Sequence, residues 1–269
     1  MNINNKLYNN LGEVMSQPNI NWKQYELQLK ADLLASKYVK NVIFTYNSKN
    51  KHKYKNDYVL CIDKNETSAK YFILFETINE MINFVEENKN KNLYEVITKD
   101  IVKPYFDIDY KEDYTTKANI KLFIKQLKTE FNNYFNKSIT ETDILTYTKH
   151  HKDDVNKIKS IHIVINGVMI SKRNNKNFCM MINKKRCGIK TLLKTCFDIK
   201  VYDIDKKFSL PYQNKLGNIK NKLGANIYFE PFETHDNFNN PKYYLINNTI
   251  DCKYTDCKSN DNIEEINKM

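Results

Sequence analysis

Long apolar runs are missing from this chain of 269 residues. No stretch approaches the roughly 20 apolar residues that a helix needs to cross a bilayer. The first residues, Met-Asn-Ile-Asn-Asn-Lys, lack the apolar segment of a secretory signal peptide. We therefore expect a soluble, intracellular protein with no membrane-spanning segment.

Glycine and proline are scarce, with five of each. No Gly-x-x-x-x-Gly-Lys-Ser/Thr segment is present, and because a P-loop needs those glycines to approach phosphates, we expect no P-loop helicase module on this chain. Cysteine is limited to six residues. In an intracellular chain of this length, reduced thiols are a better expectation than a disulfide framework.

Positive charge is abundant, since 43 Lys and Arg residues outnumber 32 Asp and Glu residues and give a formal net charge of +11. Such an excess favours a polyanionic partner, either nucleic acid or a membrane surface, and charge alone does not choose between them. The richness in Asn, Lys, Ile and Tyr is typical of an A+T-rich coding sequence, as in many large DNA viruses, parasites and plasmids.

Apolar periodicity and turn residues divide the chain into a loose polar arm (1–20), a core (21–250) and a polar tail (251–269). One helix is predicted from Trp22, with Asn21 as its cap, and another after Thr77, which has capping-box spacing to Glu80. A third helix is predicted over 117–135. Strands are predicted at 41–46, 58–62, 71–75, 93–97 and 143–148.

Residues 149–157 are polar and are predicted to form a loop. The two adjacent histidines within it, His150 and His151, suggest a metal. No Cys or acidic residue lies at a recognised ligand spacing, however, so a solvated loop is the better interpretation. A later helical segment, 174–193, has a basic face, which is either simply solvated or in contact with nucleic-acid phosphates.

Two carboxylates lie two residues apart in the apolar stretch Tyr105-Phe-Asp-Ile-Asp109. Side chains of a strand alternate between its faces, so Asp107 and Asp109 share one face, opposite Phe106 and Ile108. Adjacent carboxylates repel each other, and a hard divalent cation such as Mg²⁺ between them relieves the repulsion. The alternative is a half-buried strand with a solvated acidic face.

Two later stretches alternate in the same way. Ser160 and His162 lie opposite three isoleucines, and Asp198 lies opposite Phe197, Ile199 and Val201 in a strand predicted over 196–202. If the three strands pair in one sheet, three carboxylates, an imidazole and a hydroxyl meet on one surface. Three acids are enough to hold two divalent cations about 4 Å apart, an arrangement that supports phosphoryl transfer.

These stretches resemble the three motifs of the archaeo-eukaryotic primase superfamily, and within it the PrimPol-like and large-virus primases. The matching residues are Tyr105-Phe-Asp-Ile-Asp109, Ser160-Ile-His162, Phe197-Asp198, Val201-Tyr202 and Phe208-Ser-Leu-Pro-Tyr-Gln-Asn-Lys215. The resemblance covers roughly residues 93–217. It implies an α/β (α+β) fold of two lobes, about 21–100 and about 101–250, with a catalytic sheet related to the RNA-recognition motif.

The resemblance also implies roles for single residues. The catalytic metal ligands would be Asp107, Asp109 and Asp198, with Asp203 and Asp205 as rivals for the third acid, and the metals would be two Mg²⁺ or Mn²⁺ ions. The residues implied in nucleotide binding are Ser160, His162, Lys206 and Lys215, and Lys103 stands where relatives often carry Arg.

Two departures weaken the implied phosphate contacts. Ser209 replaces a usual Arg, and Ile158 stands where some relatives have Lys, with Lys157 and Lys159 as the alternative candidates for that contact. Relatives often carry a zinc module, but a structural zinc ion needs four ligands, and Cys252, Cys257 and His235 leave that set incomplete. We therefore do not expect zinc.

The resemblance implies a DNA primase or primase-polymerase core that copies a single-stranded DNA template from nucleoside triphosphates during DNA replication. A separate replicative helicase is an expected partner, and a viral protein would act in the cytoplasm or nucleus of the infected cell. Two alternatives stay open. One is a non-catalytic nucleic-acid-binding subunit with a primase-like fold, and the other is a metal-dependent nuclease.

Overall fold

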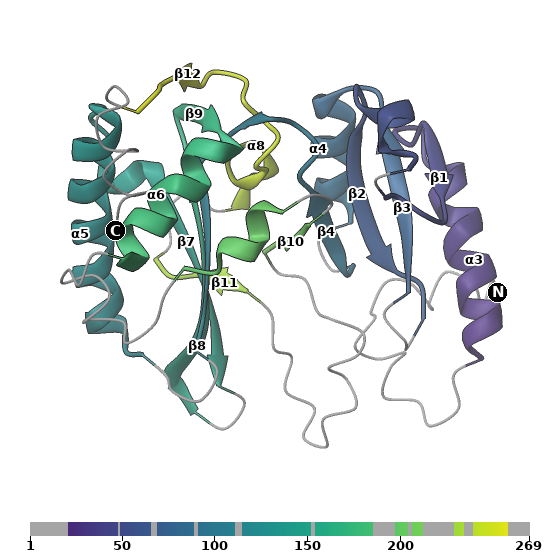
Figure 1. The fold of residues 1–269 in the computed structure, drawn as a ribbon. Coiled ribbons are helices and arrows are strands. Elements are labelled where there is room, and N and C mark those ends of the chain that lie inside the picture. Colours follow the sequence, from purple (N-terminus) through teal and green to yellow (C-terminus); the bar gives the residue numbers. More distant parts are fainter. Residues whose placement is uncertain are drawn as a thin grey trace. The chain divides into compact units, whose positions relative to one another are not determined.

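The chain folds into two compact units, residues 1–98 with 207–230 and residues 99–206 with 231–269, in a computed structural model (Figure 1). The fold is a mixed α/β fold of α+β type, because most of its strand pairings are antiparallel. The residues that the structure describes are 21–47, 49–65, 69–88, 91–110, 115–151, 154–184, 197–203, 206–211, 229–233 and 239–257. The predicted arm, 1–20, lies outside them.

The first unit is built on one five-stranded sheet with the strand order β1-β3-β2-β4-β10. Its strands are β1 (Asn41–Ile43), β2 (Tyr58–Asp63), β3 (Lys70–Phe75), β4 (Leu93–Val96) and β10 (Lys207–Ser209). The segment of β10 falls in the lobe expected over about 101–250, whereas its pairing with β4 places it in the first unit.

Two helices, α3 (Trp22–Ala35) and α4 (Ile78–Glu87), cover one face of this sheet. The hydroxyl of Tyr71 donates to Glu26 of α3, and the ring of Phe75 lies 5.3 Å from that of Phe84 in α4. Both predicted caps are confirmed. Asn21 accepts from the backbone of α3, and Thr77 forms the reciprocal capping box of α4.

The opposite face of the sheet carries an apolar cluster that surrounds the fully buried Cys61. The short helix η2 (Lys51–Tyr54) adds Tyr54 to this cluster. At the same face Asp63, which is 1% exposed, pairs with Lys70 and accepts from the Tyr94 hydroxyl at 3.0 Å. The buried carboxylate is therefore both neutralised and hydrogen-bonded, as a buried charge requires.

The second unit holds a four-stranded sheet in the order β11-β7-β8-β6 and a three-stranded sheet in the order β12-β9-β5. The strands are β5 (Ile101–Val102), β6 (Tyr105–Asp109), β7 (Ile144–His151), β8 (Asp154–Ile165), β9 (Val168–Ser171), β11 (Glu230–Pro231) and β12 (Lys253–Tyr254). β12 comes from the segment predicted as a polar tail and pairs in parallel with β9.

The helices α5 (Lys117–Phe135) and α6 (Lys172–Lys184) bring aromatic rings to the apolar side of β6. Phe106 lies 5.8 Å from Phe178 of α6 and 5.2 Å from Phe197, and Phe197 lies 6.0 Å from Phe123 of α5. The predicted bounds of α5 are confirmed. This packing fixes which side of β6 is left for its two acids.

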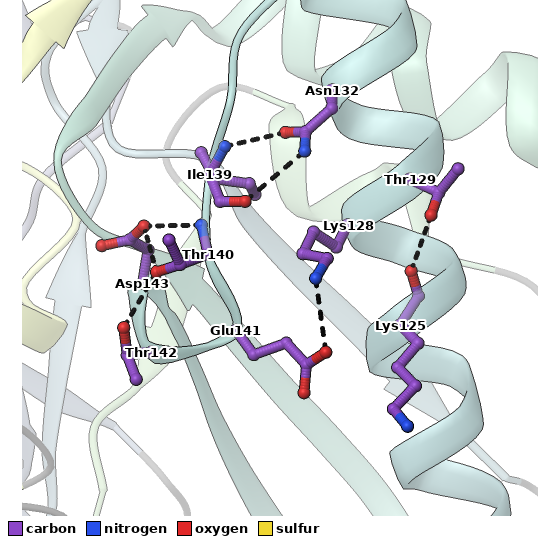
Figure 2. A network of polar contacts seen from close by, with 9 residues as sticks. All are labelled: Lys125, Lys128, Thr129, Asn132, Ile139, Thr140, Glu141, Thr142 and Asp143. Atoms are coloured by element: carbon purple, nitrogen blue, oxygen red, sulfur yellow. Dashed lines mark hydrogen bonds and ion pairs between the residues drawn. The ribbon is translucent and has the colours of Figure 1, made fainter.

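A polar network ties the end of α5 to the short helix η3 (Glu141–Asp143), as Figure 2 shows. The Asn132 side chain accepts from the Ile139 N–H at 2.9 Å and donates to the Ile139 carbonyl at 3.4 Å. Lys128 pairs with Glu141 at 3.3 Å. One asparagine side chain thus satisfies both backbone groups of a residue that lies outside the helix and holds the approach to β7 in place.

Two sequence predictions about this unit are wrong. Residues 149–157 are not a loop, because β7 continues to His151 and β8 begins at Asp154. Strand pairing uses backbone groups, so it persists where the side chains no longer alternate. The predicted strand at 196–202 is instead the helix η4 (Ile199–Tyr202), because the Asp198 side chain accepts from the Lys200 N–H at 2.8 Å and caps a turn.

Within the described ranges, none of the helices combines the length and the hydropathy that a bilayer-spanning segment needs.

Candidate functional site

The acids of β6 lie directly opposite the polar residues of β8. In the antiparallel register Asp107 faces His162 and Asp109 faces Ser160. Directly opposed residues of an antiparallel pair project from the same face, so the four side chains form one polar patch. The predicted sharing of a face by these two motifs is confirmed.

The contacts inside this patch are short. Nε2 of His162 lies 3.3 Å from Oδ1 of Asp107, and the Ser160 hydroxyl donates to Oδ1 of Asp109 at 2.5 Å. Ser160 and His162 are 5% and 6% exposed, whereas Asp109 is exposed. The side chains of the patch on β8 are therefore buried, and the acids on β6 are more exposed.

Asp198 reaches this patch through its backbone. Its N–H donates to the carbonyl oxygen of Asp107 at 2.9 Å, which lays the segment before η4 along the free edge of β6. Its carboxylate accepts from the Lys200 N–H at 2.8 Å. The structure thus brings the third motif beside the first, with the Asp198 side chain serving as a helix cap.

Asn183 of α6 clamps the segment that carries Asp198. Its side chain donates to the carbonyl of Phe197 and accepts from the N–H of Phe197, each at 3.0 Å. This reciprocal pairing repeats the arrangement that Asn132 makes with Ile139. The position of Asp198 is therefore set by the hydrogen bonds of Asn183 to the preceding residue, Phe197, and by its own hydrogen bond to Asp107.

Tyr202 anchors the C-terminal end of η4 to the backbone of β6. Its hydroxyl donates to the carbonyl of Tyr105 at 2.5 Å and lies 3.1 Å from Sγ of Cys179. The Tyr105 hydroxyl in turn donates to the Val201 carbonyl at 3.1 Å. Burial raises the pKa of Tyr202 well above its usual value, so the phenol remains a donor in this anchor.

Lys103, which stands where relatives carry Arg, is 1% exposed. Its ammonium donates to the carbonyls of Lys242 and Tyr243 at 2.7 and 2.8 Å, within the short helix α8 (Pro241–Tyr244). The ring of Tyr244 at the end of that helix lies 6.1 Å from Tyr147 of β7. Lys103 thus holds α8 in place with its own donors.

The remaining predicted residues are exposed, paired elsewhere or outside the described residues. Lys206 is exposed, and Lys215, Asp205 and His235 lie outside the described residues. Asp203 pairs with Lys176 at 3.0 Å, and this hydrogen bond lowers its pKa. Cys252 and Cys257 are free thiols.

A hard cation fits one feature of the patch. Oδ1 of Asp107 is buried and accepts no hydrogen bond, and the 3.3 Å approach of His162 is an ion-pair distance without hydrogen-bond geometry. Buried polar atoms are rarely left without a partner. Carboxylate oxygens are the ligands that Mg²⁺ prefers. Among the described side chains, however, no three His, Cys, Asp or Glu residues converge into a metal-binding group.

A third strand, β7, belongs to this patch, although the sequence predicted the strand without its place beside the acids. β7 places Tyr147 opposite His162 and Lys149 opposite Ser160. The alternation within 144–149 was the available signal, but it does not show which residue of β8 each one meets.

A cleft of about 420 Å³ lies elsewhere in the second unit. It opens between α5 and β7, and its lining includes Lys121, Lys125 and Thr146. Thr146 alternates with Tyr147 along β7 and so projects from the sheet face opposite the acids. The cleft is therefore separate from the patch.

Comparison with known proteins finds a viral relative. An uncharacterized protein, ORF49, of Ostreid herpesvirus 1 (isolate France) is 31% identical in a 178-residue alignment that covers 56% of this chain. The chain spans 16% of the length of that relative. No protein-family model matches the chain.

Proposed function

We propose that the second unit carries a nucleotidyltransferase site of the primase type. In this proposal the protein is the catalytic core of a DNA primase or primase-polymerase, with the two-lobed primase fold and a catalytic sheet related to the RNA-recognition motif. It joins nucleoside triphosphates on a single-stranded DNA template during replication, with two Mg²⁺ or Mn²⁺ ions as cofactors. A viral setting accords with the relative in Ostreid herpesvirus 1.

The observation that carries the proposal is the register of β6 and β8. A pair of acids faces a serine and a histidine, and the segment bearing Asp198 is hydrogen-bonded to the edge of the same strand. Three motifs from distant parts of the chain therefore meet at one strand. The buried Oδ1 of Asp107, which accepts no hydrogen bond, gives this meeting point an unsatisfied acceptor.

The residues of this chain have distinct tasks in the proposed reaction. Asp107 and Asp109 would hold the divalent ions, which supply charge neutralisation for phosphoryl transfer when bound. His162, at 3.3 Å from Asp107, would orient that carboxylate beside the nucleotide's phosphates. Asp198 would supply a third carboxylate if its side chain left the cap of η4.

Incubation of the purified chain with a single-stranded DNA template, labelled nucleotides and Mn²⁺ tests the proposal. We expect products longer than a dinucleotide. A shortened template would reveal a nuclease instead, and binding without any product would reveal a non-catalytic subunit. Either result contradicts the proposal.

Single substitutions locate the site in the same assay. Asp107→Asn and Asp109→Asn should abolish synthesis and leave thermal stability equal or higher, because removing one of two adjacent acids relieves their repulsion. A variant of either that extends primers at the parental rate would show that the site is misplaced.

Asp198→Asn separates charge from structure. Asparagine also caps helices, so the turn should persist while synthesis and metal affinity fall. Asp203→Asn is the matched control, because Asp203 is exposed and pairs with Lys176. It should retain most activity, and equal effects of the two substitutions would contradict the assignment of Asp198.

A further inference from the structure

A row of three side chains crosses the sheet beside the acids. Asp109 of β6 lies opposite Ser160 of β8, and Ser160 lies opposite Lys149 of β7. Because directly opposed residues project from one face, the three side chains stand next to each other on the face of the patch. Lys149 is half-buried, with Ser160 between it and the acid.

The pairing of β7 with β8 changes immediately after Lys149. The register shifts between Lys149 and His150 and again between His150 and His151. Irregularities of this kind bend a strand and re-aim its side chains, and they are frequent next to active sites. Lys149 is thus the last residue of the regular ladder, at the point where β7 leaves it.

The hydroxyl of Ser160 has a single proton, and that proton is used. Ser160 donates to Asp109 at 2.5 Å, so the hydroxyl has no second proton for a phosphate oxygen. A phosphate at this end of the patch needs another donor. An ammonium group supplies three donors and a positive charge.

Strand β8 offers no such donor at this place among its described side chains. Ile158, two residues before Ser160 and on its face, is fully buried. Lys159 is exposed and adjacent in sequence to Ser160, and strand alternation turns it to the other face. On the neighbouring strand β7, Lys149 projects from the face that holds the acids.

We propose that Lys149 is the phosphate-binding cation of this site and contacts the triphosphate group of the incoming nucleotide. The inference rests on the proposed function and changes its details. Lys149 takes the phosphate contact that the resemblance gives to Ser160, and Ser160 positions Asp109.

Nucleotide binding by the full chain tests this role directly. The affinity for a nucleoside triphosphate and for inorganic triphosphate is measured by calorimetry in Mg²⁺, for the parent and for Lys149→Ala. We expect the Kd to rise by about tenfold or more, as for the loss of a charge-assisted contact. Lys149→Arg should restore most of the affinity, and Lys159→Ala, the matched control, should bind as the parent does.

The kinetic readout separates this inference from the function on which it rests. Lys149→Ala should raise the KM for the nucleotide while kcat at saturation stays near the parental value. Unchanged Kd and KM in Lys149→Ala, with synthesis still lost in Asp107→Asn, would overturn the role of Lys149 and support the polymerase. If Lys149→Ala binds triphosphate more weakly but the parent chain makes no product, the role of Lys149 would stand and the proposed polymerase would be overturned. A parent chain that binds no triphosphate would overturn both.

Discussion

The thiol of Cys61 shows how burial alters one ionisable side chain. It is fully buried in the first unit, and desolvation raises its pKa from 9.0 to about 12. The folded chain therefore keeps a proton that the unfolded chain loses near pH 9. The stabilisation from this group is complete below about pH 9 and declines as the pH rises toward 12.

Cys61→Ala should reduce this dependence on pH. Between pH 8 and 11 the free energy of unfolding of the parent should fall by about 2.5 kcal/mol more than that of the variant. Urea unfolding at several pH values measures the slope, which is independent of the cavity that the substitution creates. Parallel slopes for the two proteins would contradict the assignment.

Single residues also mark the limit of sequence reasoning. Alternation alone indicated that Asp107 and Asp109 share a face, because a period of two follows from strand geometry. It could not find Lys149, because the register between β7 and β8 depends on the turn and the core, and neither can be read from one chain's pattern. It also could not reveal that the amine of Lys103 is buried against carbonyls.

Among the elements, η4 and its clamp were the least predictable. Phe197, Ile199 and Val201 alternate as a strand does, but the local hydrogen bond from the Lys200 N–H to Asp198 turns the chain. Helix α5 was predicted with correct bounds, because 19 residues of apolar periodicity outweigh any single local contact. Short segments are decided by one side chain, and long ones by the core.

The Asn183 clamp on this segment can be tested by substitution. Asn183→Ala removes a donor and an acceptor from Phe197, so the free energy of unfolding should fall by about 1–2 kcal/mol. Hydrogen exchange of the amides of Phe197 and Asp198 should accelerate. Asn177→Ala on the same helix is the control, and equal exchange in both variants would show that the clamp does not hold the segment.

At the scale of the whole molecule, the net charge of +11 makes a prediction about binding. Affinity for a single-stranded DNA template should fall with a slope of about −3 or steeper in a plot of log affinity against log salt, because phosphate contacts release counterions. Fluorescence anisotropy with a labelled oligonucleotide measures this slope. An uncharged peptide nucleic acid of the same sequence is the control, and a template affinity that ignores salt would argue against nucleic acid as the partner.

The pairing of β10 with β4 also has a consequence for the order of synthesis. Lys207–Ser209 pairs with Tyr94–Val96, so the last strand of the first unit emerges from the ribosome only after most of the second unit. Until then β4 is an open edge, and such edges pair readily with other chains. The nascent first unit therefore lacks its fifth strand, β10, while the part of the chain that carries the acids is still being synthesised.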